Sequence, residues 1–403
     1  MSIPRLPPEL LDHVVDLLHD KKHTLQNCCL VSKSWIPRTR KHLFAKIALS
    51  SPNSLRSWKK LFPDPSSSPA YYTHTLSVTC YPATAVPCDW IKAFSRVVCF
   101  VFTLRAHDVH EPAVSLVPFY GFSPMITFLR VFLPVLPSSQ VFDLIFSFPL
   151  LEDLQVISYR IQIDDGDDSD ELSTVVHHPN PPVFTGSLGL WAGVMLKLIV
   201  NRLLSLQDLR FRLLTLLLIH EEDLSSAKAL VNGCSNTLES LDITCSHNCT
   251  YVHISTHTKS SFSFLGTFVS VSIDLSKAGK LKDATFIVKQ PDPKWALMAL
   301  QTVTDDQQNL QQITLHLPLV LLHPTSYRAD PADVELAIGE TAYQHWLELD
   351  HFLTQFLESR SIYLEVVLPA SSRGAIEGQN GCVDSLLPEV MRRGMADLVE
   401  RRR

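Results

Sequence analysis

The sequence predicts an α/β chain in which a short N-terminal three-helix module precedes an irregular solenoid of strand-plus-helix units. Two observations support this prediction. Apolar residues recur at helical spacing near the N-terminus, and a short apolar-x-x-apolar-x-apolar pattern then returns along the chain. The 403 residues are 46% hydrophobic and the mean hydropathy is +0.11, which argues against wholesale disorder.

The first helix is expected to begin near Pro8, because proline is tolerated in a first helical turn and Glu9 beside it complements the helix dipole. This helix has two apolar stripes, Leu10, Val14 and Leu17, and Leu11, Val15 and Leu18. One stripe would suffice to pack so short a helix on its two neighbours. The second stripe therefore predicts contact with another polypeptide or with the rest of the chain.

Two further helices are expected in the same module. Thr24 is the favoured N-cap of the second helix, and Ser32 and Ser34 are alternative caps of the third, in which Pro37 still falls in the first turn. The residues at helical spacing in these two helices are Leu25, Cys28, Cys29, Ile36, Arg40, Leu43 and Phe44.

Ordered motifs cover residues 3–49. A Leu-Pro-x-Glu-Leu-Leu opening lies at Leu6–Leu11, a Leu-Val-Ser-Lys-x-Trp element at Leu30–Trp35, and a closing Leu-Phe pair at Leu43–Phe44. This segment resembles an F-box, in which the usual isoleucine position is Val14 here. The alternative is an ordinary three-helix start to a larger domain.

The F-box resemblance implies that residues 1–49 bind a Skp-type adaptor and through it join a cullin-based ubiquitin ligase. The adaptor-binding residues that it implies are Leu6, Pro7, Leu10, Leu11, Val14, Leu30, Val31, Lys33 and Trp35.

Residues 73–370 are expected to form the repeat array. The last positions of several neighbouring copies lie about 25 to 29 residues apart, the period of a leucine-rich repeat. Spacing stretches between Val156 and Leu190 and between Ile243 and Phe286, so the repeats are irregular. The copies are Cys99/Phe102/Leu104, Ile126/Leu129/Val131, Leu151/Leu154/Val156, Phe211/Leu214/Leu216, Leu238/Leu241/Ile243, Leu281/Ala284/Phe286 and Leu310/Ile313/Leu315.

The segments between the copies contain helix signals and interruptions. Helices are expected at 89–94 and 138–146, a linker helix and Pro/Ser-rich linker at 50–72, and an acidic loop at 164–171. Residues 371–403 are expected to be a loose segment followed by a capping helix from Ser385 to Glu400.

The repeat segments Ser147–Leu154 and Leu230–Leu241 resemble the fungal F-box proteins with degenerate leucine-rich repeats. This resemblance implies a non-catalytic receptor subunit of a Skp–cullin–F-box ubiquitin ligase, whose concave strand face grips an unknown protein substrate. Two alternatives stay open: a leucine-rich-repeat interaction scaffold outside any ligase, and an ordinary α/β domain with coincidental leucine spacing.

Two segments contain residue types that can bind metal ions. Aligning Gly166 with the required glycine of an EF-hand places isoleucines at ligand positions, so the acidic loop fails as a calcium site. A Cys/His cluster has pairs too close together to wrap round zinc, although a metal-dependent enzyme there is a third hypothesis. Its members are Cys245, His247, Cys249, His253 and His257. No cofactor and no catalytic residue is therefore expected.

Composition narrows the partners and the compartment. The net charge of −6 gives no electrostatic reason to expect nucleic acid or an anionic membrane as a partner. The most apolar stretch, Pro112–Pro137, contains Arg130 and five prolines, so no membrane-spanning helix is expected there. Nine cysteines scattered among apolar residues are typical of a reduced cytoplasmic or nuclear protein.

Overall fold

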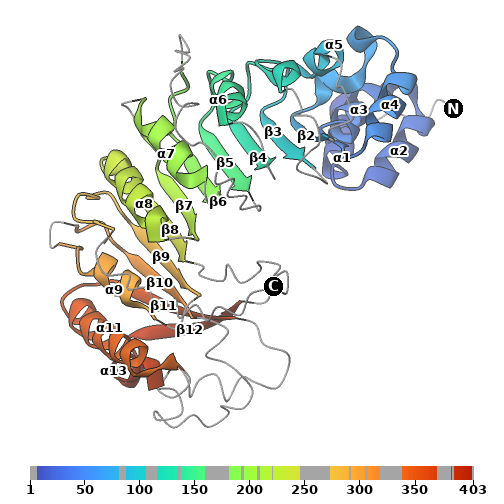
Figure 1. Cartoon of the computed structure of the whole chain (residues 1–403). Helices are drawn as coiled ribbons and strands as arrows, with labels where there is room; N and C mark the ends of the chain where they lie inside the picture. Colours follow the sequence, from blue (N-terminus) through green and yellow to red (C-terminus); the bar gives the residue numbers. More distant parts are fainter. Residues whose placement is uncertain are drawn as a thin grey trace, which may run out of the picture. The chain divides into compact units, whose positions relative to one another are not determined.

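The predicted α/β class is confirmed by the computed structural model, in which parallel strands alternate with helices (Figure 1). Contacts divide the chain into two compact units, Met1–Phe184 and Thr185–Arg403. The structure describes residues 7–80, 88–105, 116–133, 138–158, 181–191, 195–206, 209–219, 221–245, 273–289, 292–304, 307–317, 338–369, 383 and 385–401. Leu6 and the acidic segment 164–171 lie outside these ranges.

The first unit begins with helices, as expected. They are α1 (Pro8–Leu17), α2 (Lys22–Val31), the 3-10 turn η1 (Lys33–Trp35) and α3 (Ile36–Leu43). Thr24 lies inside α2, which begins at Lys22 without a side-chain cap, so the prediction that Thr24 caps it is wrong. Ser32 caps η1 by accepting a hydrogen bond from the Ser34 backbone N–H at 3.3 Å.

A parallel sheet follows in the first unit, with its strands side by side in chain order. It starts inside the segment 1–49, because β1 pairs with β2. Its strands are β1 (Lys46–Leu49), β2 (Thr75–Cys80), β3 (Cys99–Leu104), β4 (Phe128–Leu133) and β5 (Asp153–Ser158). The connecting elements are α4 (Pro52–Leu61), η2 (Pro65–Ser67), η3 (Pro69–Tyr72), α5 (Cys88–Ile91), η4 (Lys92–Phe94), η5 (Val117–Phe119) and α6 (Ser138–Phe146).

The second unit repeats this arrangement with parallel strands in chain order. Its strands are β6 (Ser187–Trp191), β7 (Leu213–Leu218), β8 (Ser240–Cys245), β9 (Asp283–Val288), β10 (Gln312–His316), β11 (Tyr363–Pro369) and β12 (Ala396–Arg401). Its helices are α7 (Met195–Leu204), α8 (Glu221–Cys234), α9 (Lys294–Leu300), α11 (Glu340–Glu358) and α13 (Pro388–Arg392).

At the start of most neighbouring strands, a single backbone carbonyl before one strand accepts two N–H groups at the start of the next. His74 C=O accepts the N–H groups of Val98 and Cys99 at 2.9 and 3.0 Å, and Glu239 C=O accepts those of Lys282 and Asp283 at 2.7 and 3.2 Å. The same bonding recurs in both units. Neighbouring repeats therefore provide hydrogen-bond partners for each other's backbone N–H and C=O groups at the strand edges.

The repeating apolar positions form buried rows across each sheet. Six of the seven predicted copies align in register within their units. The copy at Cys99/Phe102/Leu104 is wrong by two residues, because Phe100 pairs with Leu129 and Phe102 with Val131. The buried rows of the first unit are Leu76, Phe100, Leu129 and Leu154, and Val78, Phe102, Val131 and Val156.

The chain from Ser385 onward does not form the single capping helix that was expected. Helix α13 ends at Arg392, Gly394 adopts a φ of 63°, and β12 then pairs with β11. A positive φ is accessible to glycine but ends a helix, which explains the change from helix to strand. Asp350 of α11 holds the start of α13, because its carboxylate accepts the Glu389 and Val390 N–H groups at 3.0 and 2.9 Å.

Candidate docking surface

The two apolar stripes of α1 lie side by side on the helix but differ in burial. Val15 is buried, and Leu11 and Leu18 beside it are partly covered. The other stripe, together with the end of α2, forms a set of large apolar side chains that are between 46% and 86% exposed. This set, called the exposed apolar stripe below, comprises Leu10, Val14, Leu17, Leu30 and Val31.

The end of α2 exposes its last two apolar residues because of how that helix packs. Leu25 and Cys28 face inward and are buried, which leaves Leu30 and Val31 on the outside just before Ser32 breaks the helix. Leu30 is the most exposed large apolar residue in the part of the chain that the structure describes. Large exposed apolar side chains on so small a helical module are typical of a protein interaction site.

The residues implied by the F-box resemblance therefore divide into groups. Leu10, Val14, Leu30 and Val31 are exposed apolar residues, and Pro7 and Lys33 are also exposed. Leu11 and Trp35 are half-buried, so part of each side chain packs within the module. Leu6 lies outside the described residues. Leu17, which those motifs did not single out, belongs to the same stripe as Leu10 and Val14.

A charged clasp fixes α1 against α3. Arg38 Nε donates to Asp16 Oδ1 at 2.6 Å, Arg38 Nη2 donates to Asp16 Oδ2, and His42 Nε2 lies 2.6 Å from Oδ1. The hydrogen bonds from Arg38 and then His42 hold the pKa of Asp16 well below its usual range. Because Asp16 lies between Val15 and Leu17, the clasp sets the direction in which the exposed apolar stripe points.

Replacing Asp16 by asparagine is expected to lower the free energy of unfolding by about 1 kcal/mol at neutral pH, a modest value because the clasp is partly exposed. The folded pKa lies below the unfolded value of 3.8, so this contribution is complete above that value and is lost as the pH falls below it. Melting curves of wild type and Asp16→Asn across this range test the expectation. If the difference between the melting midpoints of wild type and Asp16→Asn stays the same as the pH falls below 3.8, the expectation is contradicted. The control is Asp12→Asn, which changes another aspartate of the same helix.

The segment that carries the exposed apolar stripe is basic. Residues 7–62 contain ten lysines and arginines against four aspartates and glutamates, a formal charge of +6, whereas the whole chain is −6. Lys21, Lys22 and Lys33 are among the exposed cations. A partner with an apolar groove and an acidic rim would match both properties.

An aromatic cluster packs the segment 50–72 into the first unit. The Trp58 ring of α4 lies 6.0 Å from Phe44, 4.8 Å from Phe62 and 5.8 Å from Phe94, measured between ring centroids. Ser51 and Ser54 cap the start of α4 reciprocally. The helix expected in this segment is present, and it connects the N-terminal helices to the sheet by buried contacts. The i, i+4 spacing of Trp58 and Phe62 is the sequence signal for it.

The described residues contain no group of three or more His, Cys, Asp or Glu side chains able to hold a metal ion. Cys245 is buried, and burial raises the pKa of its thiol. The remaining members of the predicted Cys/His cluster, residues 247–257, lie outside the described residues. The six cysteines that the structure describes with side chains, Cys28, Cys29, Cys80, Cys99, Cys234 and Cys245, carry free thiols.

Comparison of the sequence with protein-family models and with curated proteins finds no match. Within the described residues, every helix is too short or too polar to cross a lipid bilayer.

Proposed function

We propose that this chain is a substrate-recruiting subunit of a Skp–cullin–F-box ubiquitin ligase. In this proposal residues 1–49 are an F-box, the exposed apolar stripe docks on a Skp-type adaptor, and the parallel strands belong to an irregular leucine-rich-repeat solenoid that holds a target protein. The protein acts in the cytoplasm or nucleus, without a cofactor or an active site of its own.

The observation that carries the proposal is the exposure of Leu10, Leu17 and Leu30. These side chains lie on one small helical module, Leu10 and Leu30 within motifs that resemble an F-box, and a protein partner would remove them from water. The basic character of the module favours a partner whose surface is acidic around the apolar contact.

The buried connection between module and sheet supports a function by proximity. The Trp58 cluster and the β1–β2 pairing tie the N-terminal helices to the strands of the first unit. A target held on such a connected body stays close to a ubiquitin donor brought by the adaptor. A high effective concentration of the acceptor lysine then replaces chemical catalysis by this chain.

Co-expression with a Skp-type adaptor, followed by size-exclusion chromatography and addition of a cullin, tests the proposal. We expect a complex that contains this chain and the adaptor and that then recruits the cullin. Separate elution of chain and adaptor would refute the proposal. A stable adaptor complex that does not recruit a cullin would instead favour an interaction scaffold outside any ligase.

A further inference from the structure

One face of the sheet in the second unit is left open by the described helices. Along β7 and β9, buried residues alternate with residues that are at least partly accessible, and the helices lie over the buried side (Figure 1). The other side, called the open face below, consists of the alternate residues of β7–β12 that begin at Leu213 on β7 and Asp283 on β9. Thr244, Thr314 and Val367 on this side are buried, so the face is accessible mainly near the starts of the strands.

Exposed apolar side chains of the second unit gather on this face. Leu213 and Tyr363 are the large apolar residues of the unit that the structure describes as exposed, and the register places both in the same row of the open face. The buried side of the same strands carries leucine, isoleucine and phenylalanine that are fully covered. Apolar exposure confined to one face indicates a surface for another polypeptide, and tyrosine is a common anchor in such contacts.

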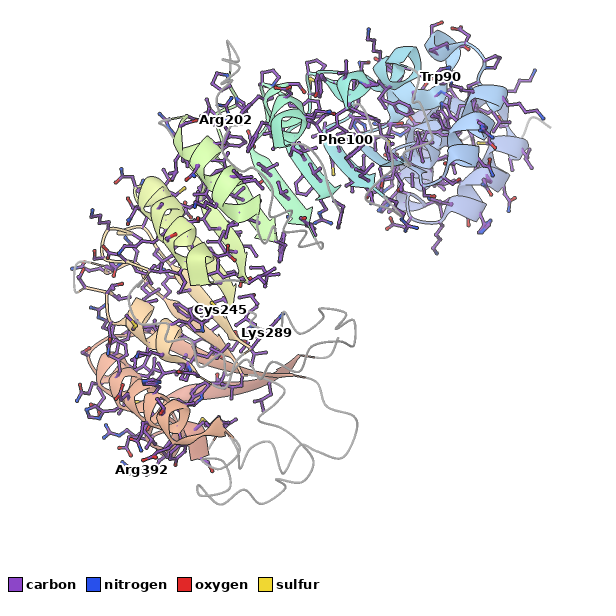
Figure 2. All side chains as sticks on the ribbon, viewed as in Figure 1. Trp90, Phe100, Arg202, Cys245, Lys289 and Arg392 are labelled. Carbon is purple, nitrogen blue, oxygen red and sulfur yellow. The ribbon has the colours of Figure 1, made fainter. Side chains whose placement is uncertain are left out.

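The charged side chains that the structure describes on the open face have one sign. Its described charged residues within the strands are Asp242, Asp283, Glu365 and Asp397, with no lysine or arginine among the side chains that the structure describes there. Figure 2 shows Arg202 and Arg392 on helices of the same unit, and Lys289 where β9 has ended. These three cations lie outside the strand rows that carry the four carboxylates.

Two of these carboxylates face each other directly. Glu365 on β11 and Asp397 on β12 are register partners on neighbouring strands, which lie about 4.8 Å apart. Like charges in that arrangement repel each other, and a cation placed between them would remove the repulsion.

Neutral groups hold these carboxylates in place. Gln312 Nε2 donates to Glu365 Oε2 at 2.9 Å, and the Tyr363 hydroxyl donates to Asp397 Oδ2 at 2.9 Å. The bond to Asp397, with the charges of Asp397 and Glu365, raises the pKa of Tyr363. By contrast, Glu239 at the foot of β8 is bonded by Arg212 and Lys282, each at 2.7 Å. Gln312 and Tyr363 thus orient Glu365 and Asp397 without bringing a positive charge to them.

We propose that the open face of the second unit binds an extended, cationic segment of a target protein, with arginine as the preferred side chain. The proposal rests on the proposed function and names the class of target segment. The guanidinium of arginine has five N–H donors in a planar fork, so it can hydrogen-bond two neighbouring carboxylates at once. The compact ammonium group of lysine fits such a pair less well.

The strand spacing sets the distance between the cations. Asp242 on β8 and Asp283 on β9 are diagonal neighbours, because Asp242 is level with Thr285. They are separated from the direct partners Glu365 and Asp397 on β11 and β12 by the neutral Gln312 and Thr314 of β10. The centres of the two pairs are three strand spacings, or about 14 Å, apart. In an extended segment this distance corresponds to basic residues about four positions apart.

Fluorescence anisotropy with the full chain tests the proposal. The probe is a labelled peptide Gly-Ser-Ala-Arg-Ser-Leu-Ser-Arg-Ala-Gly at about 50 mM salt, where electrostatic screening is weak. We expect saturable binding, at least tenfold weaker for the same peptide with glutamine at both arginine positions. The double variant Glu365→Gln/Asp397→Asn is expected to bind the arginine peptide at least tenfold more weakly than the wild type.

The control variant Glu340→Gln/Glu348→Gln removes two exposed carboxylates from α11 on the helical side of the same unit, and binding within twofold of the wild type is expected. Thermal melting checks that both variants fold. The proposal is overturned if the wild-type chain binds the arginine and glutamine peptides equally well. It is also overturned if Glu365→Gln/Asp397→Asn and Glu340→Gln/Glu348→Gln weaken binding of the arginine peptide to the same extent. Adaptor binding by Glu365→Gln/Asp397→Asn is measured alongside, so loss of peptide binding with retained adaptor binding separates this inference from the proposed function.

Discussion

Replacing Leu10 and Leu30 together by alanine is expected to weaken binding of a Skp-type adaptor roughly 100- to 1,000-fold. Each substitution removes apolar area that contributes about 0.8 kcal/mol per buried CH₂, so the pair loses roughly 3–4 kcal/mol at a covered interface. Every 1.4 kcal/mol corresponds to a tenfold change in the dissociation constant. Isothermal titration of the purified adaptor into wild-type and variant chains measures the change.

The same double variant is expected to keep its fold, because both side chains lie mainly in water in the free chain. Its melting midpoint should stay close to that of the wild type. Leu61→Ala is the matched control, since Leu61 is a leucine of α4 that is 71% exposed and lies outside the exposed apolar stripe. If Leu61→Ala weakens adaptor binding as much as the double variant does, the stripe is not the contact surface.

The elements that could be predicted are those specified by local sequence. Helix α6 spans Ser138–Phe146 as expected, because a serine start and an apolar periodicity occur within nine residues. The strands β4 and β5 were also found, since alternation of apolar residues is a local signal. Both units therefore have the predicted class of secondary structure and its order along the chain.

Register on β3 could not be predicted from the same signal. Phe100, Phe102 and Leu104 are all buried, so an alternating pattern fits equally well when it is shifted by two residues. The choice depends on which residue of β4 lies opposite, and this is a contact between segments nearly 30 residues apart. Strand β12 was missed for a related reason, because pairing with β11 replaces the helix that the local sequence favours after Ser385.

The candidate site was predictable in its composition but not in its orientation. The sequence contains both stripes of α1, yet only packing decides that Val15 faces inward and Leu10 outward. The clasp between Asp16 and Arg38 joins residues 22 positions apart, and no motif marks it. The charge pattern of the open face likewise depends on register, because Glu365 and Asp397 become neighbours only when β11 and β12 pair.

Replacing Phe100 by alanine is expected to destabilise the first unit by about 3–5 kcal/mol, the usual cost of removing a buried aromatic side chain. Phe100 is fully buried on β3 (Figure 2), and its ring centroid lies 5.0 Å from that of Phe122 and 5.9 Å from that of Phe119. The alanine would leave a cavity facing residues of neighbouring repeats, so the loss spreads beyond one strand.

Urea denaturation followed by circular dichroism measures this effect, with Phe128→Ala as the matched control. Phe128 lies on β4 of the same sheet but points to the partly accessible side, so its removal should cost about 1 kcal/mol. A solenoid transmits stability through contacts between adjacent repeats, and Phe100 supplies such contacts on its buried side. Equal destabilisation by Phe100→Ala and Phe128→Ala would mean that the buried side of the sheet is not the main source of stability in this unit.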